Sequence, residues 1–240
     1  MHMDFEEANT LTLSILEEAP AYHRWIVEKM RPWLGEAILE VGCGVGHLTG
    51  LLLEHGKVLA TDVNEDYLQI VQNKFRDHTN LKKVFLWDIR RPAPKELDEV
   101  IDSIVCSNVL EHIEEDEKTL GYFYRALSPG GRLILLVPSL KWLYNNLDRE
   151  LGHFRRYSTR ELYKKLEAQG FKVCHLTFLN GVGIFGWCLN GTILRRRLLP
   201  VQQVRIFNKL VPFLIQIEKI IPTVLGQSLI AIGQKEGGEV

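Results

Sequence analysis

The sequence lacks several features that would mark it for other compartments or partners. It has four cysteines in 240 residues, and none stands in a CxxC pair or at a spacing typical of a metal site. It also lacks an apolar run of about 18 uncharged residues, so no segment is expected to span a membrane. The first ten residues, MHMDFEEANT, are acidic and contain no apolar core of a secretory signal. We therefore expect a cytoplasmic protein whose thiols are reduced.

An excess of charge of one sign is also absent. The chain has 29 Lys and Arg against 30 Asp and Glu, a net charge of −1, so no nucleic-acid partner is expected. The charge is unevenly spread, because residues 180–226 contain six basic residues and one acidic residue. Their net charge of +5 leaves −6 for the rest of the chain. This segment is thus a basic exception in an acidic protein.

Short apolar runs alternate with amphipathic stretches along most of the chain. The runs predict strands at residues 37–41, 57–62, 82–87, 102–107, 131–138, 171–179 and 227–234. The amphipathic stretches predict helices at residues 21–33, 46–54, 65–76, 114–126 and 159–169. Ser158 and Glu161 form a capping box for the last of these helices, and Gly170 stands where it should end. This alternation favours βαβ units and a mostly parallel, doubly wound sheet.

The length of the chain, 240 residues, suits a single domain over 1–240. Residues 1–20 are predicted to form an N-terminal helical segment. Residues 139–157 and 180–226 do not fit the alternation of strands and helices. They are predicted to be insertions on the doubly wound frame, the first lid-like and the second helical.

The stretch 38-ILEVGCGVGHLT-49 places glycines at positions 42, 44 and 46 directly after an apolar run. Chains place glycines this densely where the backbone approaches a ligand closely. A dinucleotide fingerprint has the order G-x-G-x-x-G and holds a pyrophosphate at a helix N-terminus. Here Glu40 stands beside the loop, and its carboxylate would repel a pyrophosphate and attract a cation.

Two further acids follow strands of the same predicted sheet. Asp62 ends the second strand, placed to accept hydrogen bonds from a ribose diol, and Asp88 follows the third strand. With Glu40, they describe a pocket for an adenosine that carries a positive charge. S-adenosylmethionine has a sulfonium, an ammonium, a carboxylate and a ribose diol, and it suits this loop better than NAD does.

Five segments, in this order and spacing, resemble the class I S-adenosylmethionine-dependent methyltransferases: ILEVGCGVGHLT, VLATDVNEDYL, LWDI, DSIVCSNVLEHI and LSPGGRLILLVPS. The resemblance covers residues from about 21 to 179 and the last strand. It implies an α/β fold with a doubly wound, Rossmann-like seven-stranded sheet, mostly parallel with an antiparallel last strand. The family's minimal frame has a short connection between strands six and seven, so residues 180–226 would be a helical insertion there.

The resemblance implies contacts to the methionine part of S-adenosylmethionine at four positions. Gly42 and Gly44 would approach the methionine moiety, and Glu40 would meet its amino group. Asn108, after the fourth strand, would lie under the same portion.

It also implies contacts to the nucleoside. Asp62 would take the ribose hydroxyls, and Val63 would pack on the adenine. Asp88 and Ile89 would meet the adenine edge. An alternative for Asp88, which precedes Ile-Arg-Arg-Pro, is that it caps a turn.

Methyl transfer requires a nucleophile held about 3 Å from the methyl group and often a base that removes its proton. Glu111 and His112 lie where the fourth strand ends, and His112 is predicted to be a catalytic base because histidine titrates near neutrality. The alternative is that His112 only braces the loop. Some relatives bind a divalent metal here through E-x-x-E-H, but Asn108 replaces the first Glu. We therefore expect no metal.

A second candidate site is 148-DRELGHFRRYS-158, after the fifth strand. His153 is predicted to be a catalytic base, and Arg155 and Arg156 are predicted to clamp a carboxylate or phosphate of the acceptor. Tyr157 is included in the predicted acceptor-binding set. The alternative is that the arginines are solvated and that Tyr157 packs onto the following helix.

Two motifs of other methyltransferase classes are absent. The fourth strand carries no Asn/Asp-Pro-Pro-Tyr of enzymes that methylate amines of DNA or glutamine, and the chain contains no Pro-Cys nucleophile for pyrimidine C5 chemistry. An oxygen or a nitrogen of a small acceptor remains, with oxygen favoured.

The basic segment 180–226 combines aromatic, aliphatic and basic residues. Apolar side chains recur at helical spacing at Val204, Phe207, Leu210, Val211, Leu214 and Ile217. Pro212 is expected to kink this helix. One interpretation is that the segment packs on the sheet or forms a homodimer interface. The other is a site for a lipid-like, anionic acceptor with peripheral membrane contact, because the Arg195–Arg197 triplet beside aromatic residues is typical of interfacial segments.

The sequence therefore predicts an S-adenosylmethionine-dependent methyltransferase that acts on a small or lipid-like acceptor. One alternative is a module on the same fold that binds the cofactor without turnover. An NAD-dependent oxidoreductase is disfavoured by Glu40 and by the glycine spacing.

Overall fold

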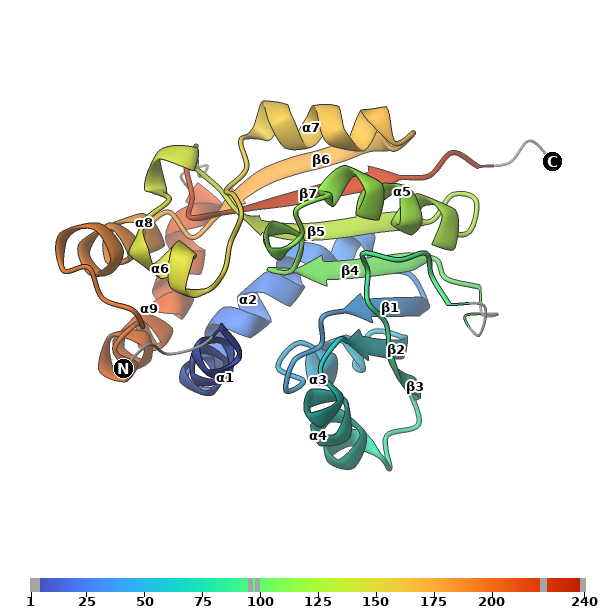
Figure 1. Ribbon diagram of the computed structural model, residues 1–240, viewed down its shortest axis with the longest axis horizontal. Helices are drawn as coiled ribbons and strands as arrows, with labels where there is room; N and C mark the ends of the chain where they lie inside the picture. Colours follow the sequence, from blue (N-terminus) through green and yellow to red (C-terminus); the bar gives the residue numbers. More distant parts are fainter. Residues whose placement is uncertain (1–4, 95–96, 98–99, 221–223, 238–240) are drawn as a thin grey trace.

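The computed structural model describes residues 5–94, 97, 100–220 and 224–237, and its strands form one sheet (Figure 1). The strands are β1 (Ala37–Val41), β2 (Lys57–Asp62), β3 (Leu81–Leu86), β4 (Ser103–Ser107), β5 (Arg132–Pro138), β6 (Lys172–Leu179) and β7 (Ser228–Gln234). Their order in the sheet is β3-β2-β1-β4-β5-β7-β6, and β7 runs antiparallel to both of its neighbours. The other neighbouring pairs are parallel. The predicted fold class is confirmed, and each predicted strand agrees with the observed one to within a residue at each end.

The α-helices of the described residues are α1 (Phe5–Leu16), α2 (Pro20–Met30), α3 (Thr49–Leu52), α4 (Glu65–Phe75), α5 (Asp116–Ala126), α6 (Asn146–Glu150), α7 (Thr159–Ala168), α8 (Gly183–Trp187) and α9 (Val201–Ile220). Short 3₁₀ helices form at η1 (Arg31–Trp33), η2 (Leu110–His112) and η3 (Lys141–Leu143), and a π-helix forms at η4 (Cys188–Ile193). The helix predicted over 46–54 is wrong in length. Gly46 adopts a φ of 82°, so the chain turns before α3 begins.

Alternate residues of each strand point to opposite faces of the sheet, and each face carries its own layer of helices. Leu39 and Val41 of β1 lie in one apolar cluster with Phe123 of α5 and Leu162 of α7. Ile38 lies in the other cluster, with side chains of α2, α3, α4 and α9. Full burial of each such side chain stabilises the fold by about 1.5–3 kcal/mol. The result is the three-layer arrangement visible in Figure 1.

Helix α9, which follows β6, belongs to the second of these layers. Val211 is fully buried, and the ring of Phe207 lies 5.5 Å from that of Tyr22 on α2, edge to face. Asn208 Oδ1 accepts a hydrogen bond of 2.8 Å from the backbone N–H of Ala21. One face of the basic segment therefore packs on the domain, as the first interpretation of the sequence expected. The helix continues past Pro212.

The segments outside the alternating frame gather at one edge of the sheet, where β1, β4 and β5 end (left in Figure 1). They are α1, the η3–α6 segment between β5 and α7, and the α8–η4 segment after β6. The carboxyl ends of parallel strands are where open α/β sheets bind ligands. Within the described part of the chain, no helix is both long and apolar enough to cross a membrane.

Candidate active site

The loop after β1 has a backbone that only glycine adopts without strain. Gly42, Gly44 and Gly46 have φ values of 71°, 51° and 82°. A Cβ at Gly42 would collide with the side chain of Val109, and one at Gly44 would lie 3.3 Å from Leu13 Cδ2 of α1. Helix α1 therefore lies over the loop at Gly44, and the turn after β4 lies against it at Gly42.

Glu40, at the end of β1, is buried next to this loop. Its Oε2 atom is buried and has no hydrogen-bond partner among the described residues. Burial, with the nearby charge of Asp62, raises the pKa of Glu40 to about 8. A buried acceptor without a donor costs about 1–3 kcal/mol, and a cationic donor on a ligand would remove that cost.

Asp62, at the end of β2, is buried and connects the end of β2 to the loop after β1. Its Oδ2 accepts a 2.8 Å hydrogen bond from the N–H of Gly44, and its Oδ1 accepts a 3.0 Å hydrogen bond from the N–H of Asn64. Burial raises its pKa, and these hydrogen bonds oppose the rise. Each carboxylate oxygen has a second lone pair, so ribose hydroxyls could still donate to it. The next residue, Val63, is 61% exposed and free of the apolar core.

Asp88 forms the turn that the sequence left as an alternative. Its Oδ1 accepts hydrogen bonds from the backbone N–H of Arg90, at 3.0 Å, and from Nε of the same residue, at 2.8 Å. The Arg90 side chain holds the pKa of Asp88 below its usual range. The side chain of Ile89 is buried in the core. Any contact of Ile89 with an adenine would therefore come from its backbone, and Asp88 would have to share its carboxylate with Arg90.

Asn108 follows β4 and is exposed, with a φ of 53°. Asparagine tolerates this left-handed conformation better than most residues. Its N–H donates a 2.8 Å hydrogen bond to the carbonyl of Leu136 on β5, so the turn is fixed by the neighbouring strand. The next residue, Val109, is the one that faces Gly42. The exits of β1 and β4 are thus in contact.

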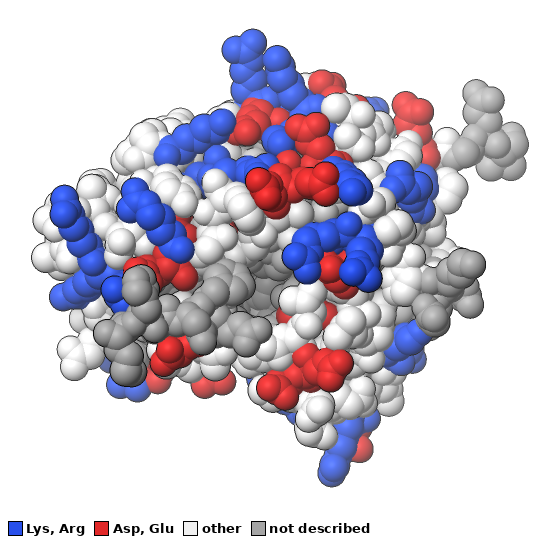
Figure 2. Space-filling view, in the orientation of Figure 1, with Lys and Arg blue, Asp and Glu red and all other residues white. Residues whose placement is uncertain are grey.

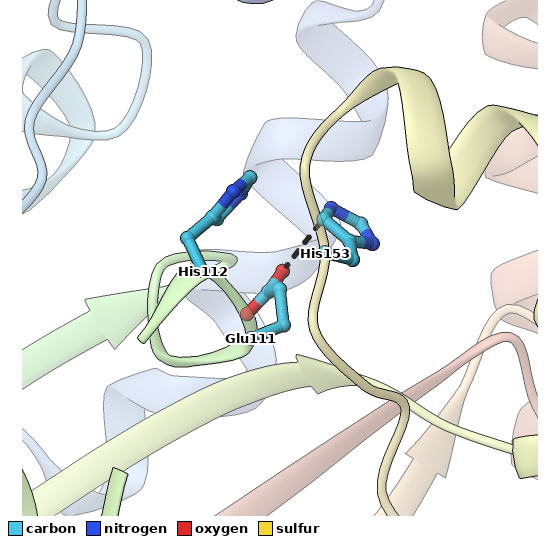
Figure 3. Close-up of side chains that lie close together, drawn as sticks. All are labelled: Glu111, His112 and His153. Atoms are coloured by element: carbon cyan, nitrogen blue, oxygen red, sulfur yellow. Dashed lines mark ion pairs between the residues drawn. The ribbon is translucent and has the colours of Figure 1, made fainter. Parts of the chain in front are cut away.

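Three ionisable side chains meet beside this exit (Figure 3). Glu111 and His112 lie on η2, and His153 lies on the loop after α6. His153 Nε2 is 3.9 Å from Glu111 Oε1, and the two histidine rings are 4.7 Å apart between centroids at an angle of 85°. The N–H of Phe154 donates a 2.8 Å hydrogen bond to the carbonyl of Glu111, so the loop after α6 is attached to η2.

Glu111 is the most unusual of the three. Its side chain is 0% exposed, and neither carboxylate oxygen has a hydrogen-bond partner among the described residues. Burial raises its pKa to about 7, although the neighbouring His153 opposes the rise. Burial and the neighbouring His153 lower the pKa of His112 to about 3. His112 is therefore a weaker base than the sequence suggested.

His153 is oriented by Asp148, which the sequence analysis did not single out. The Nδ1 atom of His153 is 2.9 Å from Asp148 Oδ1, which favours the tautomer with its proton on Nδ1 and an unprotonated Nε2. Asp148 Oδ2 accepts hydrogen bonds of 3.0 Å from Trp187 Nε1 and from the N–H of Asn145. Burial alone would raise the pKa of Asp148, but His153 and the charge of Arg156 hold it below its usual range.

Arg156 and Tyr157, two of the predicted acceptor-binding residues, are buried and bonded to other groups of the protein. Arg156 is 2% exposed; its Nε donates a 2.8 Å hydrogen bond to Asp148 Oδ1, and its Nη1 donates one of 2.9 Å to the carbonyl of Ser139. Tyr157 is 0% exposed, and its hydroxyl donates a 2.8 Å hydrogen bond to Asp116. The polar groups of Arg156 and Tyr157 can point into the protein because their hydrogen-bond partners are also buried.

Arg155 differs from both, because its side chain remains 24% exposed. Its Nη1 lies 3.0 Å from Asp116 Oδ1, and its Nη2 donates a 2.8 Å hydrogen bond to the carbonyl of Glu114. Of the predicted arginine pair, only Arg155 could reach an acceptor, and it would have to exchange these partners to do so.

Comparison with known proteins shows what this chain is similar to. Residues 39–133 match a family model described as a methyltransferase domain. The chain is 34% identical over 106 residues to the ubiquinone/menaquinone biosynthesis C-methyltransferase UbiE of Yersinia pestis, a match that covers 42% of each protein. The chain thus matches about two fifths of the length of this relative.

Solved structures share the whole fold at low identity. A chain from the complex between the Trm112 methyltransferase activator and a putative methyltransferase of Haloferax volcanii matches with a TM-score of 0.68 at 13% identity, over 98% of this chain and 99% of that one. An S-adenosylmethionine-dependent methyltransferase of Clostridium acetobutylicum matches with a TM-score of 0.59 at 15% identity, over 91% and 92%. At these identities the likeness is one of fold. Together with the family model, it confirms the resemblance to the class I methyltransferases that the sequence motifs indicated.

Proposed function

We propose that this class I methyltransferase transfers the methyl group of S-adenosylmethionine to a small acceptor held beside Glu111 and His153. The observation that carries the proposal is the buried Oε2 of Glu40, an acceptor without a donor beside a loop of three positive-φ glycines. A cationic ligand whose other end is a nucleoside satisfies both this atom and Asp62. A pyrophosphate next to Glu40 would be repelled by the ionised carboxylate and would hold this carboxyl in its protonated form.

The residues that would hold S-adenosylmethionine are those that the resemblance implies: Glu40, Gly42, Gly44, Asp62, Val63, Asp88, Ile89 and Asn108. Glu40 and the loop glycines would receive the methionine portion, and Asp62 would accept from the ribose hydroxyls. When bound, the cofactor supplies a methyl group on a sulfonium, which a nucleophile attacks in line. The bond from sulfur to the methyl carbon breaks as the bond to the acceptor forms, and S-adenosylhomocysteine leaves.

His153 is the better of the two predicted bases. Asp148 fixes its ring, leaves Nε2 to take the acceptor's proton, and stabilises the imidazolium that results. This is the arrangement of a base with its orienting carboxylate. His112 remains a second candidate, weakened by the low pKa that its burial imposes.

The atom that is methylated is proposed to be an oxygen or a nitrogen, with oxygen favoured, as the sequence indicated. The Yersinia relative is a C-methyltransferase, which favours carbon as a second candidate. The match covers 42% of that relative, so its acceptor indicates which type of atom could be methylated and does not identify the acceptor of this protein.

The outer face of the basic segment supports a lipid-like acceptor and peripheral contact with a membrane. Four apolar side chains follow one another at helical spacing on α9: Ile206, Leu210, Phe213 and Ile217, at 60%, 47%, 65% and 37% exposure. Phe185 of α8 is 76% exposed. Arg195 and Lys209 are exposed on the same segment. In Figure 2, basic side chains stand among uncharged ones on the side where Figure 1 places α6 and α8.

An exposed apolar stripe with basic neighbours is typical of helices that lie in a membrane interface. We therefore propose that a cytoplasmic protein presents α8 and α9 to an anionic membrane, from which a lipid-like acceptor would enter. A homodimer that buries the same stripe is the second candidate for this surface. Residues 139–157 are proposed to act as the lid over the acceptor.

The experiment is incubation of the protein and a bacterial lysate, membranes included, with S-adenosylmethionine labelled on its methyl group. The products are then separated into organic, aqueous and macromolecular fractions. We expect label in the organic fraction and much less with an Asp62→Ala variant, whose cofactor binding is weakened. Label in the aqueous fraction alone would contradict the lipid-like acceptor, and no label above the variant would favour a module that binds the cofactor without turnover.

A further inference from the structure

We propose that Glu111, His112 and His153 form a site for a divalent transition-metal ion. One oxygen of Glu111 and one ring nitrogen of each histidine lie within 4.8 Å of one another (Figure 3). Two imidazoles and a carboxylate are a donor set typical of zinc and of other first-row divalent metals. The proposal rests on the proposed function, because the site would lie beside the acceptor.

The separations are close to those of a loaded site. Metal-to-ligand distances of about 2.0–2.2 Å place tetrahedral ligand atoms roughly 3.3 Å apart. No two of the three ligand atoms are more than 4.8 Å apart, so the side chains would have to draw together by about 1.5 Å or less. Side-chain rotation can supply a movement of this size, since Glu111 and His153 stand on different segments.

Glu111 supplies the independent reason to expect a cation. Its carboxylate is fully buried and neither oxygen accepts a hydrogen bond from a described residue. Nearby, the opposite charges of Asp148 and Arg156 offset each other across a 2.8 Å contact, so this pair does not neutralise Glu111. A buried carboxylate without a hydrogen-bond donor is costly, and buried charges are normally paired or coordinate metals. The nearest charge partner of Glu111 is His153, whose Nε2 lies 3.9 Å away, beyond hydrogen-bond distance.

His153 is held as a metal-ligating histidine usually is. Such a histidine donates its second ring N–H to a carboxylate, which fixes the tautomer and the ring orientation. Here Asp148 lies 2.9 Å from Nδ1, and Nε2 is left on the side of Glu111. Asp148 is itself held by Trp187 and Arg156. The outer partners of a metal site are therefore already in place.

The site was not expected from the sequence. There, Asn108 replaced the first Glu of E-x-x-E-H, and no metal was predicted. The fold supplies the missing donor from another segment, because the loop after α6 is attached to η2 beside Glu111.

Three protein ligands would leave at least one coordination position open, as in catalytic sites. An acceptor oxygen bound there would be polarised and would lose its proton more readily. In that case Nε2 of His153 would bind the metal and would not act as the base.

The test is calorimetric titration of untagged, chelator-treated protein with Zn²⁺ and with Co²⁺, the latter also followed by its visible absorption. We expect one equivalent to bind. Glu111→Gln and His153→Gln should each weaken binding at least about 100-fold, and Asp148→Asn about 10- to 100-fold. His78→Gln, a change at an exposed histidine remote from this site, should leave binding unchanged.

Binding of S-adenosylhomocysteine by each variant checks that it is folded, and Glu111→Gln decides the question even where a histidine variant does not fold. No stoichiometric binding to the wild-type protein would overturn the metal site, as would equal affinity in Glu111→Gln. Labelled methyl transfer that survives chelation would overturn the polarising role of the metal, and would leave the proposed function and the His153 base standing.

Discussion

The replacement Asp148→Asn should destabilise the protein far more than its small change in shape suggests. Asp148 is fully buried, and its carboxylate holds Arg156, His153 and Trp187 at 2.8, 2.9 and 3.0 Å. Asparagine keeps the volume and removes the charge. The guanidinium of Arg156, which is 2% exposed, would then lose the counterion to which it is hydrogen-bonded.

Removal of one partner of a buried ion pair costs about 3–5 kcal/mol. In a domain of this size, each kcal/mol lowers the melting temperature by about 2–4 °C, so the expected decrease is roughly 6–20 °C. The control is Asp77→Asn, whose partner Arg76 lies 3.3 Å away with side chains 90% and 73% exposed. An exposed pair contributes about 0–1 kcal/mol, so the control should melt within about 4 °C of the wild type.

The assay is thermal unfolding followed by circular dichroism at neutral pH, repeated at acidic pH. The pKa of Asp148 is lowered in the fold, so the stability that it contributes is present above its unfolded pKa, about 3.9, and is lost as the pH falls further. The difference between wild type and Asp148→Asn should therefore shrink on acidification. Equal melting temperatures for Asp148→Asn and Asp77→Asn at neutral pH would refute the account of the loop after α6.

Three other changes test the cofactor site and the outer surface. Because the pKa of Glu40 is about 8, a cationic ligand must displace its proton, and affinity for S-adenosylhomocysteine should therefore rise with pH up to about 8. Glu40→Gln should abolish this pH dependence, which calorimetric titration in two buffers would show. Asp62→Ala removes a charged acceptor worth about 1.5–3 kcal/mol and should weaken the same binding roughly 10- to 150-fold; an unchanged Kd would contradict the ribose contact. Phe213→Asp should reduce co-sedimentation with anionic liposomes at least about tenfold, whereas Tyr163→Asp, at an exposed aromatic on α7, should not; equal loss in both would count against α9 as the contact.

The frame of the fold was predictable because its signals are local. Each strand is a short apolar run bounded by a turn, and Asp62 and Glu40 sit at strand ends whose meeting at one sheet edge follows from parallel topology. The exit of β4 could be placed next to the loop after β1 for the same reason. Helix α3 was overestimated because the apolar residues after Gly46 continue a helical pattern that the positive φ of that glycine interrupts.

The interior of the loop after α6 was not predictable by the same reasoning. From the sequence, two adjacent arginines are expected to be solvated or to bind an anion. Only the fold shows that Arg156 points inward to Asp148 while Arg155 stays near the surface. Both partners of Arg156 are polar, so burial leaves no apolar pattern in the sequence. The spacing of Asp148, His153 and Arg156 in one short segment was the available signal. This spacing does not show that the three side chains lie beside Glu111, because α5 and β5 separate Glu111 from them in the sequence.

The measurement that tests the central claim most directly is calorimetric titration of the purified protein with S-adenosylhomocysteine and, separately, with NADH. The claim is that Glu40, the glycine loop and Asp62 hold S-adenosylmethionine and not a dinucleotide. We predict one equivalent of S-adenosylhomocysteine bound, with binding weakened in Asp62→Ala, and no binding of NADH. Saturable binding of NADH without binding of S-adenosylhomocysteine would contradict the account.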